Sequence, residues 1–229
     1  MTHIQVGSEG PNNDFTADAW RVFRIVSEFV DGFETMTHLG PSVSIFGSAR
    51  LPSSHPYYQM AVDVAAHISK KGFAIITGGG PGVMEAANKG AQDVAGPSCG
   101  LSVDLPYEDE PNGFIDPKYR LRFRYFFVRK VMFIRYAQGY VFLPGGYGTL
   151  DELFEALTLI QTKKIHPFPI YLMGKQYWSG LIDWIKEVMI SEKCVSDKDL
   201  DLIQITDDPA VVANGIERHY QRDRAEKNF

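Results

Sequence analysis

The sequence predicts a Rossmann-like α/β domain, in which helices cover both faces of a doubly wound parallel sheet and an extra helix precedes it. Three observations support this fold class. Short apolar segments alternate with longer segments of helical periodicity from residue 43 onward. Glycine-bearing turns follow three of the short segments, where parallel strands lead into helices. The 229 residues, 45% of them hydrophobic and 22% charged, fit one domain of this kind.

An N-terminal extension comes before the alternation. We expect residues 1–14, which are polar and contain glycine, to be a disordered tail, and residues 15–229 to form a single Rossmann-like domain that begins with a helical extension. Residues 15–38 predict a long helix because apolar side chains recur in them at helical spacing. This apolar stripe consists of Trp20, Phe23, Val26, Val30 and Phe33. A helix with such a stripe must cover another apolar surface.

The first half of the domain predicts the order βαβαβ, which is typical of a parallel sheet. Its expected strands and helices are, in chain order, 43–46, 57–71, 73–77, 83–95 and 98–103. Residues 104–118 contain three prolines and a glycine, so we expect a loop that can fold over a ligand.

The second half repeats the alternation of strands and helices. The expected strands are 121–123, 139–143, 170–173 and 203–205. The expected helices are 126–137, 150–161, 178–191 and one that begins at Pro209.

The turn after the strand at 139–143 is the strongest candidate for an anion site. Backbone N–H groups of Gly145, Gly146 and Gly148 would meet the positive end of the following helix dipole, an arrangement that binds phosphate. Thr149 can cap this helix and donate its hydroxyl to a phosphate. Glu152 adds a carboxylate one helical turn later. The combination suggests chemistry on a sugar phosphate.

Two further turns lie where ligands of open α/β sheets bind, beyond the carboxyl ends of strands. They supply Gly47 and Ser48 in the first turn and Gly79 and Gly80 in the second as candidate binding residues. The second turn can equally be a tight connection from strand to helix. It does not match G-x-G-x-x-G, because Val83 occupies the last glycine position, and no P-loop is present.

Composition excludes several other classes of protein. A net charge of -5 argues against nucleic-acid and membrane partners. We interpret most aromatics of the segment 120–135 as core and most of its cations as solvated, and we expect one or two of the cations to face the ligand. The two cysteines and six histidines lack metal-ligand spacing, so we expect neither a metal nor a cofactor. Without a leader or an apolar run of about 18 residues, the expected location is the cytoplasm.

Three runs together resemble one known family. Residues 78–85, 128–132 and 144–152 are similar to the Lonely Guy (LOG) family of cytokinin-activating phosphoribohydrolases, and the last run matches its PGGxGTxxE motif at every fixed position. The similarity spans about residues 40–190. It implies a Rossmann-like fold and hydrolysis of a purine nucleoside 5′-monophosphate to free base and ribose 5-phosphate. Members are often labelled lysine decarboxylases, but the sequence supplies no pyridoxal phosphate site.

The resemblance also implies roles for individual residues. Arg129 and Glu152 match the catalytic pair, and the glycines at 145, 146 and 148 with Thr149 match the phosphate-binding loop. Met84, Glu85 and Lys130 are further candidates for substrate binding, although a first-turn acid such as Glu85 is often only solvated. Met84 and Met132 are candidates for lining an apolar pocket for the base.

Quaternary structure and reaction type complete the expectations. The N-terminal helix and the apolar face at 153–160 indicate a homo-oligomer, either a dimer or a dimer-based hexamer. Glu152 can stabilise the transition state, orient water or act as a nucleophile, and the sequence does not separate these roles. Base exchange by a ribosyltransferase and carriage of a nucleotide or cofactor without turnover are the alternatives.

Overall fold

The computed structural model describes residues 15–104 and 110–222. The expected disordered tail at 1–14 and the middle of the expected loop at 104–118 lie outside the described residues.

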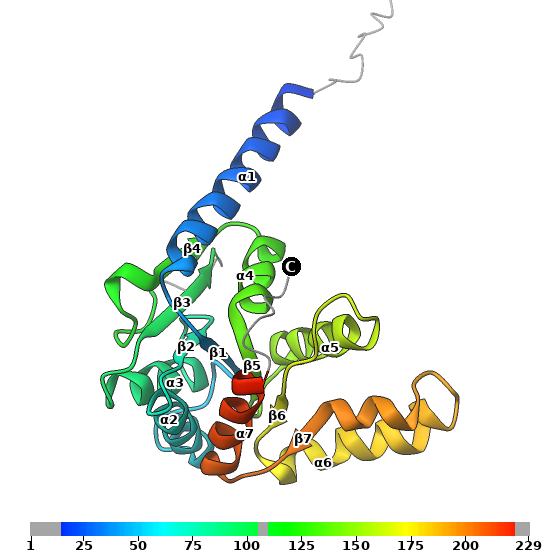
Figure 1. The fold of residues 1–229 in the computed structure, drawn as a ribbon. Helices are drawn as coiled ribbons and strands as arrows, with labels where there is room; N and C mark the ends of the chain where they lie inside the picture. The colour runs from blue at the N-terminus through cyan, green and yellow to red at the C-terminus, as the bar shows by residue number, and fades with distance from the viewer. Residues whose placement is uncertain (1–14, 105–109, 223–229) are drawn as a thin grey trace, which may run out of the picture.

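The domain is built on a seven-stranded sheet in which every neighbouring pair of strands is parallel (Figure 1). The strands are β1 (Ser42–Phe46), β2 (Ala74–Thr77), β3 (Ser98–Val103), β4 (Arg120–Phe123), β5 (Ala137–Phe142), β6 (Ile170–Leu172) and β7 (Ile203–Ile205). Their spatial order is β4-β3-β2-β1-β5-β6-β7. The chain thus moves outward from β1 to β4 and returns beside β1 as β5. This reversal is the position at which open α/β sheets bind ligands.

Helices cover both faces of the sheet, which confirms the predicted fold class. The longer helices are α1 (Phe15–Thr37), α2 (Pro56–Ser69), α3 (Val83–Gln92), α4 (Phe126–Tyr136), α5 (Tyr147–Gln161), α6 (Lys175–Trp184) and α7 (Pro209–Arg222). Helices α2, α3 and α7 share one buried cluster with the sheet. The end of α1 shares the other cluster with α4, α5 and α6.

The central strands are buried on both faces because each face has its own layer of helices. In β5, Val141 belongs to the cluster on one face, whereas Tyr140 and Phe142 belong to the cluster on the other. Phe46 of β1 stacks on Phe142 with ring centroids 5.0 Å apart. This stacking joins β1 to β5 directly beneath the reversal point.

Two helices begin three residues earlier than the sequence predicts. Helix α5 begins at Tyr147, and Gly146 is its N-cap. Thr149 therefore lies inside the first turn and does not cap the helix, which corrects our expectation for its backbone role. Helix α6 begins at Lys175 because Gly174 has a φ of 93°, a left-handed conformation that turns the chain directly from β6 into the helix.

The end of the expected helix at 178–191 also differs. Helix α6 ends at Trp184, and a π-helical segment, Ile185–Ile190, follows it directly. A 3-10 helix follows at Asp197–Leu202 and was not predicted, because its run of aspartates and leucines has no extended periodicity. A second 3-10 helix, Pro117–Tyr119, leads into β4.

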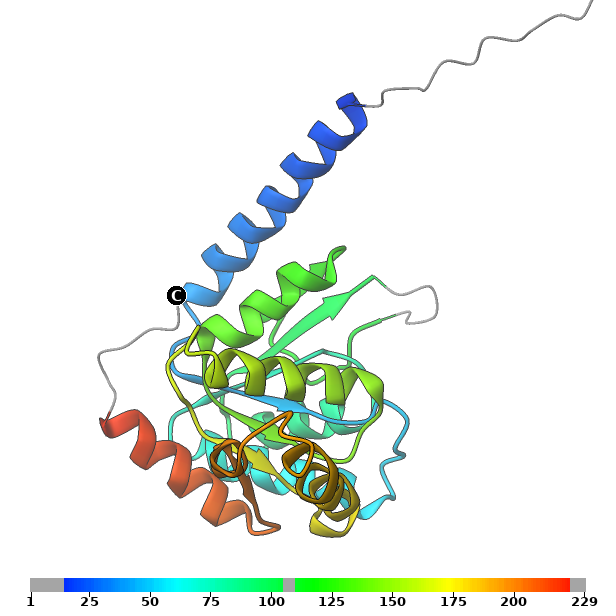
Figure 2. The same cartoon turned by 90° about the vertical axis from the view of Figure 1, so that its right-hand side faces the viewer.

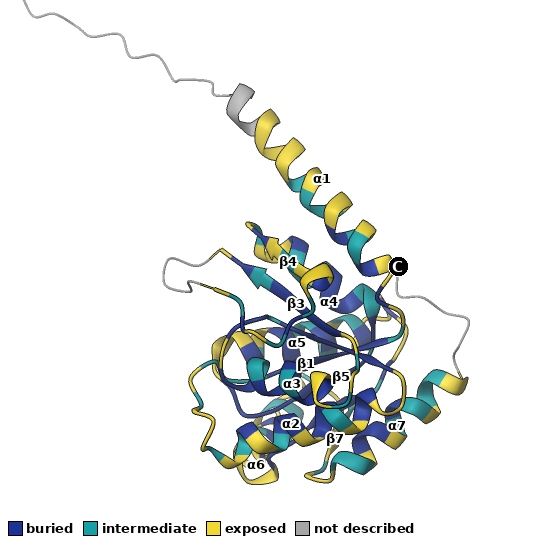
Figure 3. Cartoon of the chain, turned by 90° about the vertical axis from the view of Figure 1, so that its left-hand side faces the viewer, coloured by how far each residue is buried: buried dark blue, intermediate teal, exposed yellow. Residues whose placement is uncertain are grey.

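Helix α1 packs on the domain through its C-terminal half and projects from it at the other end (Figures 1 and 2). Met36 is fully buried, whereas Trp20 and Phe23 are 63% and 66% exposed. Figure 3 shows the outer part of α1 as almost wholly exposed. Most of the predicted stripe is therefore uncovered in the single chain. Among residues 15–104 and 110–222, no helix combines the length and the apolar character needed to span a membrane.

Candidate active site

A cavity of about 690 Å³ lies at the carboxyl ends of β1 and β5, where the strand order reverses. This volume is typical of a site for a small organic ligand. All three glycine turns reach it, together with the first turns of α4 and α5. Its lining consists of Phe46, Gly47, Ser48, Ala49, Arg50, Gly78, Met84, Val103, Phe126, Arg129, Phe133, Gly145, Gly146, Tyr147, Gly148, Thr149, Leu150, Glu152 and Tyr177.

Ser48 connects the three glycine turns through its backbone. Its N–H donates to the carbonyl of Pro144 at 2.9 Å, and its carbonyl accepts from Val83 N–H at 3.0 Å. Gly82 has a φ of 69°, and a Cβ atom there would collide with the carbonyl oxygen of Ser48. The close approach of these backbones places the start of α3 beside the turn that precedes α5.

The turn at 145–148 is held by a hydrogen bond from Tyr177, and its glycines 146 and 148 are exposed. The hydroxyl of Tyr177 donates to the carbonyl of Gly145 at 2.5 Å. Gly145 has no side chain, so the side chain of Thr149 can lie against its Cα atom, where a Cβ would collide. Gly146 and Gly148 are exposed, and the first N–H groups of a helix have no partner within it. These donors and the α5 dipole face one wall of the cavity.

Glu152 lies one turn further along α5 and is only 5% exposed. Burial raises the pKa of its carboxyl from 4.5 to about 7, because an ionised carboxylate loses solvation there. The positive charges of Lys130 and Arg129 oppose this increase in pKa, whereas Glu155 and Asp151 add to it. A carboxyl that titrates near neutral pH inside a cavity is typical of a catalytic acid, base or electrostatic stabiliser.

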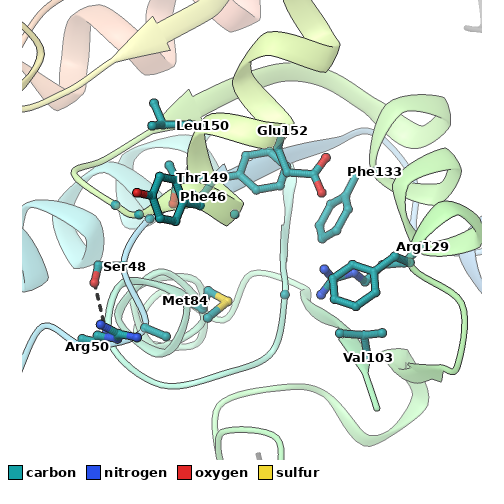
Figure 4. A pocket seen from close by; sticks show the side chains of 18 of the residues that line it. Phe46, Ser48, Arg50, Met84, Val103, Arg129, Phe133, Thr149, Leu150 and Glu152 are labelled. Carbon is teal, nitrogen blue, oxygen red and sulfur yellow. Dashed lines mark hydrogen bonds between the residues drawn. The ribbon is translucent and has the colours of Figure 1, made fainter. Parts of the chain in front are cut away.

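Arg129 approaches the same cavity from α4. Figure 4 shows its guanidinium and the Glu152 carboxylate extending inward from the two helices. The guanidinium lies 4.9 Å from the ring centroid of Phe126 and 5.9 Å from that of Phe133. These ring contacts restrict its orientation. The cavity therefore combines a guanidinium group, a buried carboxylate and an exposed glycine turn at the start of a helix.

Four of the candidate binding residues do not line the cavity. Gly79 and Gly80 form the bend behind it, and their carbonyls accept hydrogen bonds from the Asn112 amide at 3.1 and 3.0 Å. The carboxylate of Glu85 accepts from the hydroxyl of Tyr58 at 2.7 Å. Lys130 forms ion pairs with acidic side chains of α5.

Of the two methionines expected to line a base pocket, Met84 lines the cavity and Met132 does not. Met132 is fully buried in the core, and its side chain packs against Gly32 of α1 outside the cavity lining. The expectation for Met132 is therefore corrected.

Several lining residues were not predicted. Arg50 follows Gly47 and Ser48 in the first turn, and its N–H donates to the Ser48 hydroxyl at 3.1 Å. Met84 lies between Arg50 and Arg129 in the view of Figure 4. The position of Arg50 directly after a glycine turn is a sequence signal that could have identified it as a lining residue. Val103 and Tyr177 carried no such signal, because they lie in separate segments that only the folded sheet brings together.

Metal ligands do not gather in the part of the chain that the structure describes, where no group of three or more His, Cys, Asp or Glu side chains is arranged to hold an ion.

Comparisons with known proteins show the family to which the chain belongs. Residues 84–216 match the model of a family described as "Possible lysine decarboxylase". The chain is 30% identical over 139 residues to the rice protein "Probable cytokinin riboside 5′-monophosphate phosphoribohydrolase LOGL3", covering 58% of this chain and 63% of the relative. It is 30% identical over 147 residues to the rice protein "Cytokinin riboside 5′-monophosphate phosphoribohydrolase LOG", covering 62% and 58%. The matches span less than two thirds of both relatives.

Solved structures support the fold. The molybdenum cofactor carrier protein of Chlamydomonas reinhardtii superposes with a TM-score of 0.56 at 19% identity, covering 80% of this chain and 99% of that one. The molybdenum cofactor binding protein of Rippkaea orientalis has a TM-score of 0.54 at 19% identity, with 78% and 94% covered. Because the family model matches more than half of the chain, this protein belongs to the LOG family, whose model carries the description "Possible lysine decarboxylase".

Proposed function

We propose that the protein hydrolyses the N-glycosidic bond of a purine nucleoside 5′-monophosphate, releasing the free base and ribose 5-phosphate. The observation that carries the proposal is the position of the buried Glu152 carboxylate in the same cavity as the glycine turn at 145–148. The names of the LOG relatives, which are phosphoribohydrolases, support the same reaction.

In this proposal the phosphate binds at the start of α5. The backbone N–H groups of Gly146 and Gly148 and the hydroxyl of Thr149 are the donors, and the helix dipole adds a favourable field. Arg50 adds a cation next to Ser48 on another part of the cavity wall. Because the phosphate does not react, its binding energy can orient C1′ of the ribose against the catalytic groups.

Glu152 then acts on the ribose. Cleavage of the bond between C1′ and the purine nitrogen develops positive charge on C1′ and the ring oxygen, and a carboxylate beside them stabilises that charge. Water supplies the oxygen that bonds to C1′, and one proton of that water is transferred to the purine nitrogen of the leaving base. Arg129 can bind ribose hydroxyls or phosphate oxygens through its two-pronged guanidinium.

The base is proposed to occupy the apolar part of the cavity. Met84, Val103, Phe126 and Phe133 supply aliphatic and aromatic surface near Arg129. Aromatic rings stack on purines, and an N6 substituent would extend the apolar contact. The proposed substrate is therefore AMP or an N6-substituted AMP, and the rice relatives are named for a cytokinin riboside 5′-monophosphate.

We also propose that the protein acts as a homo-oligomer, a dimer or an assembly of dimers. The exposed apolar side chains of α1 are Trp20, Val22, Phe23, Val26 and Val30. A row of large apolar side chains along a projecting helix marks a protein contact. Leu153 and Ile160 of α5 are instead buried within the chain, so that face contributes less than the sequence suggested.

One incubation separates the possible activities. The protein is mixed with AMP, or with N6-isopentenyl-AMP, and with labelled adenine, and the products are resolved by chromatography. Free base with ribose 5-phosphate supports the hydrolase. Incorporation of labelled adenine into nucleotide would indicate a transferase, and saturable binding of AMP without any product would indicate a carrier. Either of the last two outcomes overturns the proposal.

A further inference from the structure

Helix α4, which carries Arg129, has no cap of its own at its N-terminus. Its N-cap residue is Tyr125, whose side chain makes no capping hydrogen bond. The cap comes instead from α1. Glu28 Oε1 accepts from Arg124 N–H at 3.0 Å, and Glu28 Oε2 accepts from Tyr125 N–H at 3.2 Å. One carboxylate therefore binds two consecutive backbone groups at the start of a helix that is distant in sequence.

The charge of Glu28 suits this position. The N-terminus of α4 carries the positive end of the helix dipole, and an anion there stabilises the first turn. Hydrogen bonds from backbone N–H groups to an ionised carboxylate are stronger than those between neutral groups. Glu28 is partly buried, which limits screening by solvent.

A short chain of hydrogen bonds connects Glu28 to Arg129. The N–H of Tyr125 binds Glu28, and the carbonyl of Tyr125 accepts from the N–H of Arg129 at 3.4 Å. This second bond closes the first turn of α4. Tyr125 therefore binds Glu28 through its N–H and Arg129 through its carbonyl, and it connects the two residues.

A second contact keeps α1 close to α4 one turn later. A Cβ atom on Gly32 would lie 2.7 Å from Cε of Met132, so the two helices approach each other closely here. The ring of Phe33 lies 5.3 Å from the guanidinium carbon of Arg135. Figure 3 shows the inner half of α1 beside α4. Residues on both sides of Arg129 in α4 thus rest against α1.

We propose that Glu28 is a positioning residue, and that α1 places the Arg129 guanidinium in the nucleotide cavity by binding the N–H groups of Arg124 and Tyr125, which lead into α4. Helix α1 then helps to position Arg129, in addition to its proposed role as the contact between copies of the chain. The proposal rests on the proposed function, because it assigns Arg129 a role in nucleotide binding or turnover. It adds a residue that lies outside the cavity lining.

The test compares three variants in the full-length protein. Glu28→Ala removes both acceptors, and Glu28→Gln keeps one acceptor but removes the charge. Glu34→Gln is the matched control, because Glu34 is exposed on the same helix. Each variant is measured for kcat and KM with AMP, for hydrogen exchange of the amides at 124–130, and for melting temperature.

We expect Glu28→Ala to lower kcat/KM by about 10- to 100-fold, the scale on which small displacements of positioning groups act. Exchange at the start of α4 should accelerate in the same variant. Glu28→Gln should lie between Glu28→Ala and the wild type, and Glu34→Gln should match the wild type. Assays well below the lowest melting temperature separate positioning from loss of folded protein, and Glu28→Gln serves if Glu28→Ala does not fold.

Unchanged exchange at 124–130 in both Glu28 variants would overturn the proposal. Faster exchange with wild-type kcat/KM would also overturn it, because the cap would then be purely structural. If the wild-type protein binds AMP without hydrolysing it, the proposed function fails on its own, and Kd for AMP replaces kcat/KM. In that case a Kd for Glu28→Ala equal to that of the wild type overturns the positioning role.

Discussion

Lys130 Nζ lies 2.7 Å from a carboxylate oxygen of Asp151, the residue that precedes Glu152. The same nitrogen lies 3.0 Å from Glu155, and the Lys130 side chain is only 16% exposed. Lys130 also follows Arg129 in α4. This cluster therefore ties the two helices that carry the proposed catalytic residues, and it places a positive charge near the Glu152 carboxyl.

Replacing Lys130 should change the titration of Glu152. The positive charge of Lys130 lowers the pKa of Glu152, so Lys130→Met should raise that pKa and move the acidic limb of the kcat/KM profile to higher pH. Activity at pH 7 should fall more than activity at pH 9. A pH–rate profile measures both, with the exposed Lys164→Met as the control. Parallel profiles for wild type and Lys130→Met would contradict the expected coupling.

Glu152→Gln should abolish most hydrolysis while keeping affinity for AMP. The amide has the size of the acid but no negative charge with which to stabilise the ribosyl cation. We expect a loss in kcat on the order of 10²-fold or more, the scale for removing a preorganised electrostatic group. Steady-state kinetics and calorimetric binding test this, with exposed Asp183→Asn of α6 as the control. A kcat close to that of the wild type would remove Glu152 from the mechanism.

The same substitution should make stability less dependent on pH. Burial raises the folded pKa of Glu152 from 4.5 to about 7, so the folded protein binds this proton more tightly than the unfolded chain. The resulting stabilisation is complete below about 4.5 and is lost as pH rises through about 7. The melting temperature of Glu152→Gln minus that of the wild type should therefore increase from pH 5 to pH 8. Calorimetry at both values tests this, and a constant difference would contradict the raised pKa.

The 5′-phosphate should be required for efficient turnover. Adenosine should show a kcat/KM at least about 10²-fold below that of AMP, because the phosphate orients the ribose. Thr149→Val should reduce activity on AMP more than on adenosine, whereas Thr149→Ser keeps the hydroxyl and serves as its control. Activity should survive EDTA. Equal kcat/KM for the two substrates would show that the turn at 145–148 does not bind phosphate.

The exposed face of α1 should join copies of the chain. Light scattering at micromolar concentration should give a mass above 25.7 kDa, at or beyond that of a dimer. Phe23→Glu combined with Trp20→Glu should lower the mass, because burying the two new charges is unfavourable. Trp184→Glu provides the control, since Trp184 is 50% exposed elsewhere on the surface. A wild-type mass of a single chain would defeat the expectation.

The sequence by itself determined the layered fold and the family. Apolar strands buried on both faces and helices with one apolar side leave periods in the sequence that are read locally. Gly145, Thr149 and Glu152 lie within eight consecutive residues at the start of one helix, so their spacing alone predicts that they share a site. The start of α5 was misplaced because glycines carry no periodic signal, and only the backbone conformation shows where the helix begins.

Only the tertiary structure decided which distant residues meet. Lys130 was expected to bind substrate, but the packing of α4 against α5 pairs it with Asp151 and Glu155. Tyr177 reaches Gly145 across 32 residues, and Glu28 reaches Tyr125 across 97. Such contacts depend on strand order and on the way each helix crosses the sheet. Strand order and helix crossing leave no pattern in the local sequence, because the same helical period is compatible with many neighbouring elements.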